Sequence, residues 1–310
     1  MWKLIIGQLP HRYLLSMQVR WILGIGCVLL SSCQTTSHTP PKQLIPASGS
    51  IYKKCGDVEL RLIPFYPEGH RASDARPAAV LFFGGGWNGG KLDQFEPQAR
   101  YLASRGMVGI LADYRVKSRH ATTPFACVAD GKSAVRWIRK NADRLGVDPN
   151  RIAAGGGSAG GHVAATTGVI SGLEEPGEDT STSSSANALL LFNPVIDNGP
   201  GGWGHARVKD RYLEISPLHN ISAGAPPTIL FLGRNDKLIP AETAQKYRDQ
   251  MHAVGSRCDL HLYDGQGHGF FNQSRNAQHF YLTVFEMDCF LSSLGWLHGK
   301  PTIVKPKTPR

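Results

Sequence analysis

A single hydroxyl group stands within the glycine run GGGSAGG at residues 155–161. Apolar stretches precede and follow this run, which predicts a strand, a tight turn and a helix, with Ser158 at the turn. Gly156 and Gly160 flank the serine as G-x-S-x-G, the spacing of a nucleophile elbow, where a β-carbon would obstruct close packing. A phosphate-binding loop is the alternative, but the run lacks the Lys-Ser/Thr pair of such loops. Ser158 is therefore the candidate nucleophile.

A serine hydroxyl needs a base to become a good nucleophile, and the base needs an orienting acid. With a nucleophile elbow, the acid and then the histidine follow the serine along the chain. Asp236 comes just after the apolar stretch 227–232, and His268 lies in a glycine-rich turn after 258–263. We expect Ser158, Asp236 and His268 to form a catalytic triad. The competing acids are Asp197, Asp259 and Asp264, and the competing histidines are His205, His219, His252, His261 and His279.

A second glycine run, LFFGGGWNGG, follows an apolar stretch in the first half of the chain. Acyl transfer needs backbone N–H groups that bind the negative charge developing on the carbonyl oxygen. We expect the amides of Gly85, Gly86 and Ala159 to form this oxyanion hole; a simple turn is the alternative for the glycine run. Trp87 and Trp203 could contact a substrate or could merely pack.

The elements that must position these residues alternate along the chain. Residues 57–67 alternate in polarity and predict an antiparallel strand, whereas later apolar runs lack alternation, as strands covered on both faces do. We therefore expect an α/β fold with a mostly parallel central sheet and helices on both faces. Further strands are expected at 78–83, 107–112, 151–154, 188–192, 227–232 and 258–263, and helices at 93–105, 127–145, 241–254 and 279–294.

The amino-terminal residues have the pattern of an export signal. Arg20 precedes an apolar run that ends in Leu30-Ser31-Ser32-Cys33, which resembles the lipobox of bacterial lipoproteins. This resemblance implies lipidation of Cys33, anchoring to a membrane by that lipid, and a periplasmic or outer-membrane location. Translation could start at Met1 or Met17. A signal cleaved without lipidation and an uncleaved anchor are the alternatives.

Four segments are expected: a signal segment at 1–33, a tether rich in Pro, Ser and Thr at 34–50, a catalytic domain at 51–297 and a basic tail at 298–310. The polar stretch 172–187 is expected to be a loop. In an oxidising compartment Cys55, Cys127, Cys258 and Cys289 could pair in three ways, between which the sequence does not choose. No metal or cofactor motif occurs among these residues. The net charge of +10 is scattered, which favours a solvated surface over a nucleic-acid site.

The motifs FGGGW, DYR, DPNRIAAGGGSAGGH, GRNDKLIP and GQGHGF together resemble the α/β-hydrolase superfamily. They are most similar to its hormone-sensitive-lipase-like and feruloyl-esterase-like carboxylesterases, over about residues 51–296. The resemblance implies the same triad and oxyanion donors as above, and a small-molecule or carbohydrate ester as substrate. It departs at Phe83, where the family usually has a histidine that supports the glycine loop, so we expect activity to survive.

The expected function is hydrolysis of short acetyl-type esters, on carbohydrates, by a serine carboxylesterase with an acyl-enzyme intermediate. The carbohydrate substrate rests on the resemblance alone. A serine peptidase similar to prolyl oligopeptidase is one alternative, although such enzymes usually carry a large propeller domain. A surface lipoprotein that binds glycans without catalysis is another. The sequence leaves the natural ester and the oligomeric state open.

Overall fold

The computed structural model describes residues 44–306, and the predicted signal segment with Cys33 lies outside them. In this part of the chain one sheet has the strand order β1-β2-β4-β3-β5-β6-β7-β8. β1 and β2 are antiparallel to their neighbours and the strands from β3 onward are parallel, so the predicted fold class is confirmed. The strands are β1 Ser50–Cys55, β2 Val58–Phe65, β3 Arg76–Phe82, β4 Val108–Ala112, β5 Val147–Gly157, β6 Ala188–Phe192, β7 Thr228–Gly233 and β8 Cys258–Tyr263.

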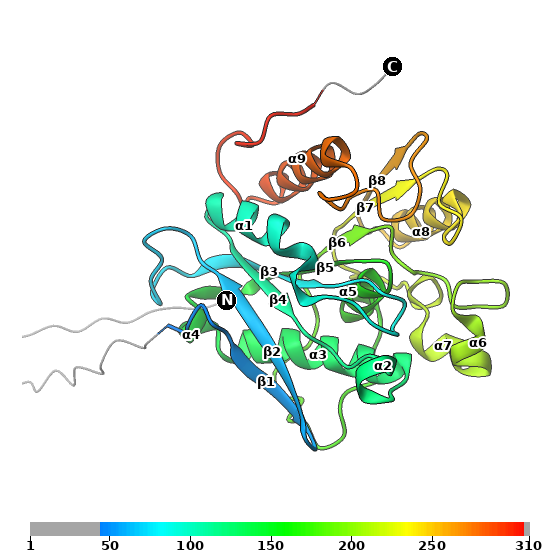
Figure 1. The fold of residues 1–310 in the computed structure, drawn as a ribbon, viewed down its shortest axis with the longest axis horizontal. Helices are drawn as coiled ribbons and strands as arrows, with labels where there is room; N and C mark the ends of the chain where they lie inside the picture. Colours follow the sequence, from blue (N-terminus) through cyan, green and yellow to red (C-terminus); the bar gives the residue numbers. More distant parts are fainter. Residues whose placement is uncertain (1–43, 307–310) are drawn as a thin grey trace, which may run out of the picture. The chain divides into compact units, whose positions relative to one another are not determined.

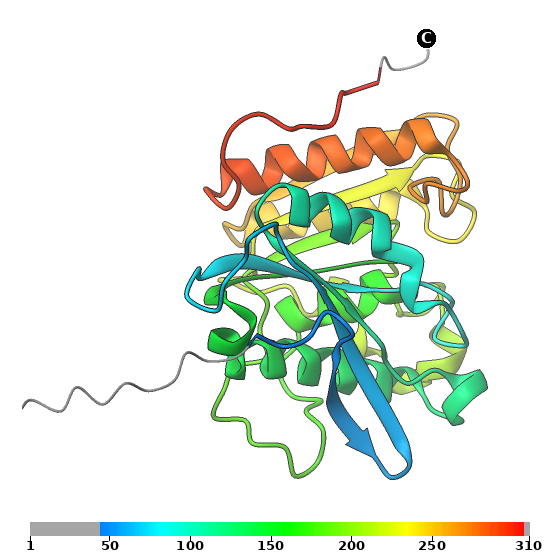
Figure 2. The same cartoon turned by 60° about the vertical axis from the view of Figure 1, so that its left-hand side comes forward.

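Helices cover both faces of the sheet (Figures 1 and 2). α1 and α9 lie over one face, and α3, α5 and α8 pack on the other. The α-helices are α1 Glu96–Ser104, α2 Lys117–His120, α3 Pro124–Lys140, α4 Ala142–Leu145, α5 Ala159–Val169, α6 His205–Val208, α7 Tyr212–Ile215, α8 Ala241–Ala253 and α9 Ala277–Ser293; the 3-10 helices are η1 Leu92–Phe95, η2 Lys209–Arg211 and η3 Pro217–His219. None of the described helices is both long and apolar enough to cross a bilayer.

The strand β3 shows why the central runs lack alternation. Ala78, Val80 and Phe82 pack into the core beside α3 and α5, while Ala79 and Leu81 pack into the core beside α1 and α9. Each side of the strand is therefore buried, and both sides need apolar residues. The parallel strands end at one edge of the sheet, where the loops that carry the candidate site residues meet.

The boundaries of several elements differ from the predicted ones. The helix expected at 127–145 begins earlier, since Pro124 provides a favourable first-turn residue, and it divides at Asn141 into α3 and α4. The strand expected at 151–154 is longer, because Val147 already pairs with Arg76 before the register shifts. The helix expected from residue 93 starts as the 3-10 helix η1.

Both ends of the domain extend beyond their predicted limits. Ile45, placed in the tether, is 2% exposed, and its carbonyl accepts a hydrogen bond from the Tyr66 hydroxyl. In the predicted basic tail, Lys305 pairs with Glu286 of α9 at 2.6 Å. The domain therefore includes residues from 44 onward, and the described part of the tail packs along α9.

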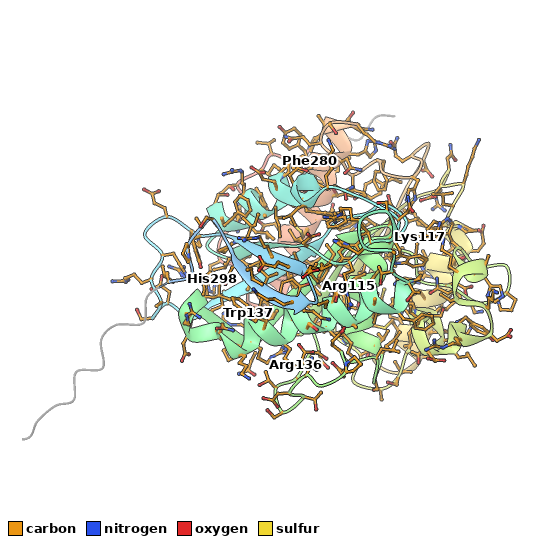
Figure 3. The ribbon with its side chains drawn as sticks, turned by 60° about the horizontal axis from the view of Figure 1, so that its bottom comes forward. Arg115, Lys117, Arg136, Trp137, Phe280 and His298 are labelled. Carbon is orange, nitrogen blue, oxygen red and sulfur yellow. The ribbon has the colours of Figure 1, made fainter. Side chains whose placement is uncertain are left out.

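The polar loop 172–187 is held by ion pairs rather than lying free in solvent. Glu174 pairs with Lys132 and Arg136 of α3, and Glu175 lies 2.7 Å from both Lys53 and Arg115. Figure 3 labels Arg115 and also Arg136, which belongs to α3. The sequence shows the polarity of this loop but not its cationic partners, because these come from separate elements.

The four cysteines within the described residues are free thiols, so no disulfide joins the elements that the structure shows. Cys127 and Cys258 are buried, and Cys55 and Cys289 are half-buried. Burial raises the pKa of the Cys258 thiol to about 12. Such buried thiols stay protonated and pack as small apolar side chains.

Candidate active site

Ser158 lies at the turn between β5 and α5 with an unusual backbone conformation, φ 54° and ψ −118°. The residues two positions before and after Ser158 must be glycines. A β-carbon on Gly160 would lie 2.2 Å from the carbonyl oxygen of Phe82, and one on Gly156 would lie 2.6 Å from the same oxygen. The strained turn is held by its own backbone, because Ser158 N–H donates to Phe192 O and Ser158 O accepts from Val195 N–H. This geometry lifts the hydroxyl above the carboxyl edge of the sheet.

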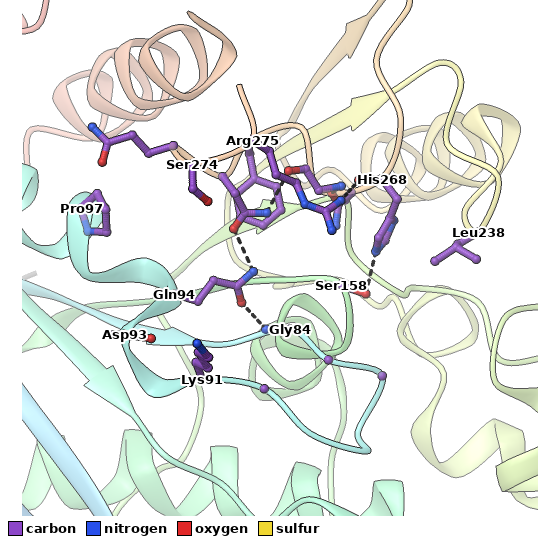
Figure 4. A pocket seen from close by; sticks show the side chains of 18 of the residues that line it. Gly84, Lys91, Asp93, Gln94, Pro97, Ser158, Leu238, His268, Ser274 and Arg275 are labelled. Atoms are coloured by element: carbon purple, nitrogen blue, oxygen red, sulfur yellow. Dashed lines mark hydrogen bonds between the residues drawn. The ribbon is translucent and has the colours of Figure 1, made fainter. Parts of the chain in front are cut away.

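The structure brings the three predicted triad residues together, and Figure 4 shows Ser158 and His268 joined by a dashed line. His268 Nε2 lies 2.9 Å from Ser158 Oγ, and His268 Nδ1 lies 2.7 Å from Asp236 Oδ2. Since a carboxylate can only accept, Nδ1 carries the proton, and Nε2 is free to accept the serine proton. The Asp236 side chain is fully buried, and its Oδ1 accepts hydrogen bonds from the amides of Leu238 and Ile239.

The competing acids and histidines lie elsewhere. Asp264 is 89% exposed in its side chain and pairs with Arg234, while Asp259 pairs with Arg257. Asp197 accepts a hydrogen bond from the amide of Gly199. None of these carboxylates contacts His268. Among the competing histidines, His205 bonds Asn198 O, His219 bonds Ser216 Oγ, His252 bonds Cys258 O, and His261 and His279 have pKa values lowered by burial.

The glycine loop after β3 has its carbonyl groups occupied by other donors. The Tyr114 hydroxyl donates to Phe83 O at 2.6 Å, and the Arg207 guanidinium donates to Gly86 O. Gly85 O accepts from the amides of Asn88 and Gly89. These bonds fix the loop without the histidine that the family usually has, and Phe83 itself stacks on Tyr114 with ring centroids 4.3 Å apart.

The backbone amides of the same loop differ in whether they have a hydrogen-bond acceptor. Gly84 N–H donates to Gln94 Oε1 at 2.6 Å. Within residues 44–306 the amides of Gly85 and Gly86 have no acceptor, and Ala159 is the first residue of α5, where an amide has no intrahelical partner. The three predicted oxyanion donors are thus amides without partners near Ser158, which is what an oxyanion hole requires.

Side chains that the sequence did not single out connect the oxyanion loop to the histidine loop. Gln94 Nε2 donates to Asn272 Oδ1, and Asn272 Nδ2 donates to the carbonyl of Gly269, next to His268. The buried Asn193 accepts from the Gly269 amide at 2.8 Å. No local motif marks these residues, and only their positions at strand ends or in loops near the glycine runs could have suggested them.

A cavity of about 650 Å³ opens at Ser158. Its lining combines the polar side chains of Gln94, Asn272 and Arg275 with the apolar ones of Pro97, Leu238 and Phe271, and Trp203 lies near the glycine loop. Trp87 is buried beneath Trp203, with ring centroids 5.0 Å apart, so it packs rather than facing the cavity. The cavity has room for a small acyl group and a polar alcohol portion.

One cluster outside this cavity could hold a metal by its residue types. Ligand atoms of Cys55, Asp130 and Glu175 lie within 4.8 Å of one another. However, Lys53 and Arg115 already pair with both carboxylates at distances from 2.6 to 2.7 Å. The two cations neutralise the acids, so the chemistry of this cluster is that of a structural ion-pair network.

A mostly parallel sheet with a strained serine between a strand and a helix, bonded to a histidine and a buried aspartate, defines the α/β-hydrolase class. The BD-FAE family model matches residues 65–200, and the model of the dienelactone hydrolase family matches residues 211–288. These two matches divide the catalytic domain between its amino-terminal and carboxy-terminal parts.

The chain is 45% identical to Thermogutta terrifontis esterase 2 phosphorylated by paraoxon, covering 81% of this chain and 95% of that one, with a TM-score of 0.78. The structure of the same esterase with propionate bound is 44% identical, covers 82% of this chain and 96% of that one, and has a TM-score of 0.78. The chain therefore belongs to the α/β-hydrolase superfamily, among its carboxylesterases. Esterase LipC of Mycobacterium tuberculosis is 32% identical over 63% of this chain and 54% of its own length. The chain spans about half the length of the curated relatives it matches.

Proposed function

We propose that this protein is a serine carboxylesterase that hydrolyses short acetyl-type esters through an acyl-enzyme. The observation that carries the proposal is a pair of hydrogen bonds at His268: Nε2 accepts from the Ser158 hydroxyl at 2.9 Å, and Nδ1 donates to Asp236 Oδ2 at 2.7 Å. In this arrangement one ring nitrogen is ready to take a proton and the other is held by a carboxylate.

In the proposed mechanism Ser158 Oγ attacks the ester carbonyl carbon while His268 Nε2 takes the hydroxyl proton. The carbonyl oxygen becomes negative and accepts hydrogen bonds from the amides of Gly85, Gly86 and Ala159. The carbon–oxygen bond to the alcohol then breaks, and the imidazolium gives its proton to the departing oxygen. A water molecule, activated by the same histidine, hydrolyses the acyl-enzyme and restores the serine.

Short acyl groups are favoured by the size of the cavity, since about 650 Å³ must hold the alcohol portion as well as the acyl group. The propionate-bound and butyrate-bound structures of the Thermogutta esterase support this choice, since both acids are short. Carbohydrate as the alcohol is supported by the amides of Asn272 and Gln273 and the hydroxyl of Ser274 in the cavity lining, which can bond to sugar hydroxyl groups.

The test of the nucleophile is a covalent adduct. A p-nitrophenyl phosphonate should label Ser158 alone, and Ser158→Ala should lose several orders of magnitude in kcat with p-nitrophenyl acetate. Recovery of the adduct on another serine, or full activity of the variant, would refute the assignment. Turnover of a peptide anilide panel in place of acetate esters would favour the peptidase alternative, and turnover of neither would favour a binding protein.

We also propose that Cys33 carries a lipid that anchors the exported enzyme to a bacterial membrane. The support is the Leu30-Ser31-Ser32-Cys33 sequence after an apolar run. Protein expressed from the full gene should partition into detergent, and Cys33→Ser should not. Equal membrane association of the two proteins would contradict the anchor.

A further inference from the structure

We propose that Arg275 binds a carboxylate on the alcohol portion of the substrate, so that the preferred substrate is an ester of an acidic sugar. This inference rests on the proposed carbohydrate esterase function. Arg275 lies in the turn before α9 and lines the cavity that opens at Ser158. Figure 4 shows its side chain extending toward His268.

The position of the guanidinium is fixed by the histidine loop. Arg275 Nη1 donates to the carbonyl oxygen of His268 at 3.1 Å. It lies so close to Gly269 that a β-carbon there would be 2.9 Å from Nη1. Gly269 has φ 83°, a backbone conformation that favours glycine. The cation is therefore held beside the catalytic histidine.

Most of the donors of Arg275 are unused. A guanidinium has five N–H donors, and within residues 44–306 only the bond to His268 O engages them. No carboxylate of the described residues lies within ion-pair distance of Arg275. By contrast Arg207, which lies beside the glycine loop, donates to Gly86 O. The free donors can hold a carboxylate through two parallel bonds.

The charge balance of the cavity also favours an anion. Besides His268, which is bonded to Asp236, the charged residues of its lining are Lys91, Asp93 and Arg275. Lys91 and Asp93 cancel in net charge, which leaves the charge of Arg275 uncompensated. The net charge of +10 on the whole chain adds a favourable field for an acidic substrate.

The mechanism assigns the anion to the alcohol portion. His268 Nε2 must give its proton to the departing oxygen, so the alcohol leaves on the side of the histidine. Arg275 lies on that side, bonded to the histidine backbone. A carboxylate on a sugar ring, near the esterified hydroxyl, would then reach the guanidinium. O-acetylated uronic acids have this arrangement.

The test compares two sugars that differ in one group. Methyl galacturonide and methyl galactoside, each acetylated at the same hydroxyl, differ by a carboxylate in place of a hydroxymethyl group. Wild-type enzyme should prefer the acidic sugar by about tenfold in kcat/KM, which is the discrimination of one charge-assisted contact. Added KCl should reduce this preference because the pair is near solvent.

Variants separate recognition from damage to the site. Arg275→Gln should bring the ratio of the two kcat/KM values to about one. Arg275→Lys should retain part of the preference, because lysine keeps the positive charge but lacks the paired donors of the guanidinium. Both kcat/KM values are measured on the same variant, so a loss of activity caused by disturbance of the His268 loop affects both and cancels in their ratio. Arg234→Gln is the matched control, since Arg234 pairs with the exposed Asp264, and should keep the wild-type ratio.

A wild-type ratio near one, or a preference that survives in Arg275→Gln, would overturn the inference. So would failure to hydrolyse both sugars by an enzyme that turns over p-nitrophenyl acetate. A preference for p-nitrophenyl hemisuccinate over p-nitrophenyl butyrate that depends on Arg275 would place the anion on the acyl side and refute the assignment to the alcohol. Failure of the wild-type enzyme to hydrolyse p-nitrophenyl acetate would instead contradict the proposed function.

Discussion

Replacing Asp236 by asparagine exchanges one carboxylate oxygen for an NH₂ group at the same place. The direction in which the new amide points follows from its neighbours. Leu238 and Ile239 N–H both donate to Oδ1 of the wild-type carboxylate, so the oxygen of the new amide must remain there. The NH₂ group then faces His268 Nδ1, where the wild-type carboxylate oxygen lies 2.7 Å away.

This orientation reverses the tautomer of His268. An NH₂ group can only donate, so Nδ1 must become an acceptor and the ring proton moves to Nε2. Protonated Nε2 cannot accept the proton of Ser158, and the imidazolium formed in the reaction has lost its counter-charge. We expect kcat to fall about 10⁴-fold, equivalent to about 5.5 kcal/mol of transition-state stabilisation.

The assay is kcat, KM and melting temperature for Asp236→Asn and Asp264→Asn side by side, with p-nitrophenyl acetate. KM should change little in Asp236→Asn, because the interaction matters mainly after proton transfer. Asp264→Asn should be close to wild type, since Asp264 contacts Arg234 rather than His268. Near-normal turnover by Asp236→Asn, or an inactive Asp264→Asn, would refute this reasoning.

Three further outcomes follow from the same geometry. Arg207→Met should lower kcat about tenfold with a smaller effect on KM, because the bond to Gly86 O that steadies the oxyanion loop is lost; a change in KM alone would contradict this. Gly160→Ala should lower both melting temperature and kcat, because the new β-carbon would lie 2.2 Å from Phe82 O; wild-type values for both would count against the packing argument. Burial raises the pKa of Glu175, but Lys53 and Arg115 outweigh it and hold the pKa of this carboxyl below its ordinary value. The ion pairs therefore stabilise the fold at neutral pH and less as pH falls through the lowered pKa. Denaturant unfolding should show Glu175→Gln less stable than wild type at pH 7, with the difference vanishing in acid; a difference independent of pH would contradict the ionic origin.

The candidate triad could be predicted from the sequence because a short local pattern marks each of its three residues. Ser158 lies between glycines after an apolar run, and Asp236 and His268 each follow an apolar strand. Parallel strands end at one edge of the sheet, so residues just after them must come close together. The fold class follows from the same runs, whereas the strand order and element limits such as the division of α3 from α4 depend on tertiary packing.

The supporting residues could not be predicted in this way because no local pattern marks them. Gln94 and Asn272 are 178 residues apart and form one hydrogen bond between two loops. Arg275 resembles any charged loop residue in the sequence, and only the structure places it beside His268 with no carboxylate partner among residues 44–306. Likewise Glu175 resembles a solvated residue of a polar loop, and only the fold reveals the cations Lys53 and Arg115 that hold it.

The strain at Ser158 and the free amides of the glycine loop have a common structural origin. A backbone at φ 54° is unfavourable for a serine, and it persists because hydrogen bonds fix both sides of the residue, with Phe192 O on one side and Val195 N–H on the other. In the facing loop, donors from Tyr114 and Arg207 hold the carbonyl oxygens of Phe83 and Gly86, while the amides of Gly85 and Gly86 have no acceptor among residues 44–306. Both features keep polar groups in place before a substrate arrives, which reduces the reorganisation needed in the transition state. A site held this way needs rigid neighbours more than a particular residue at Phe83, and the stacked Tyr114 ring provides that rigidity where the family usually has a histidine.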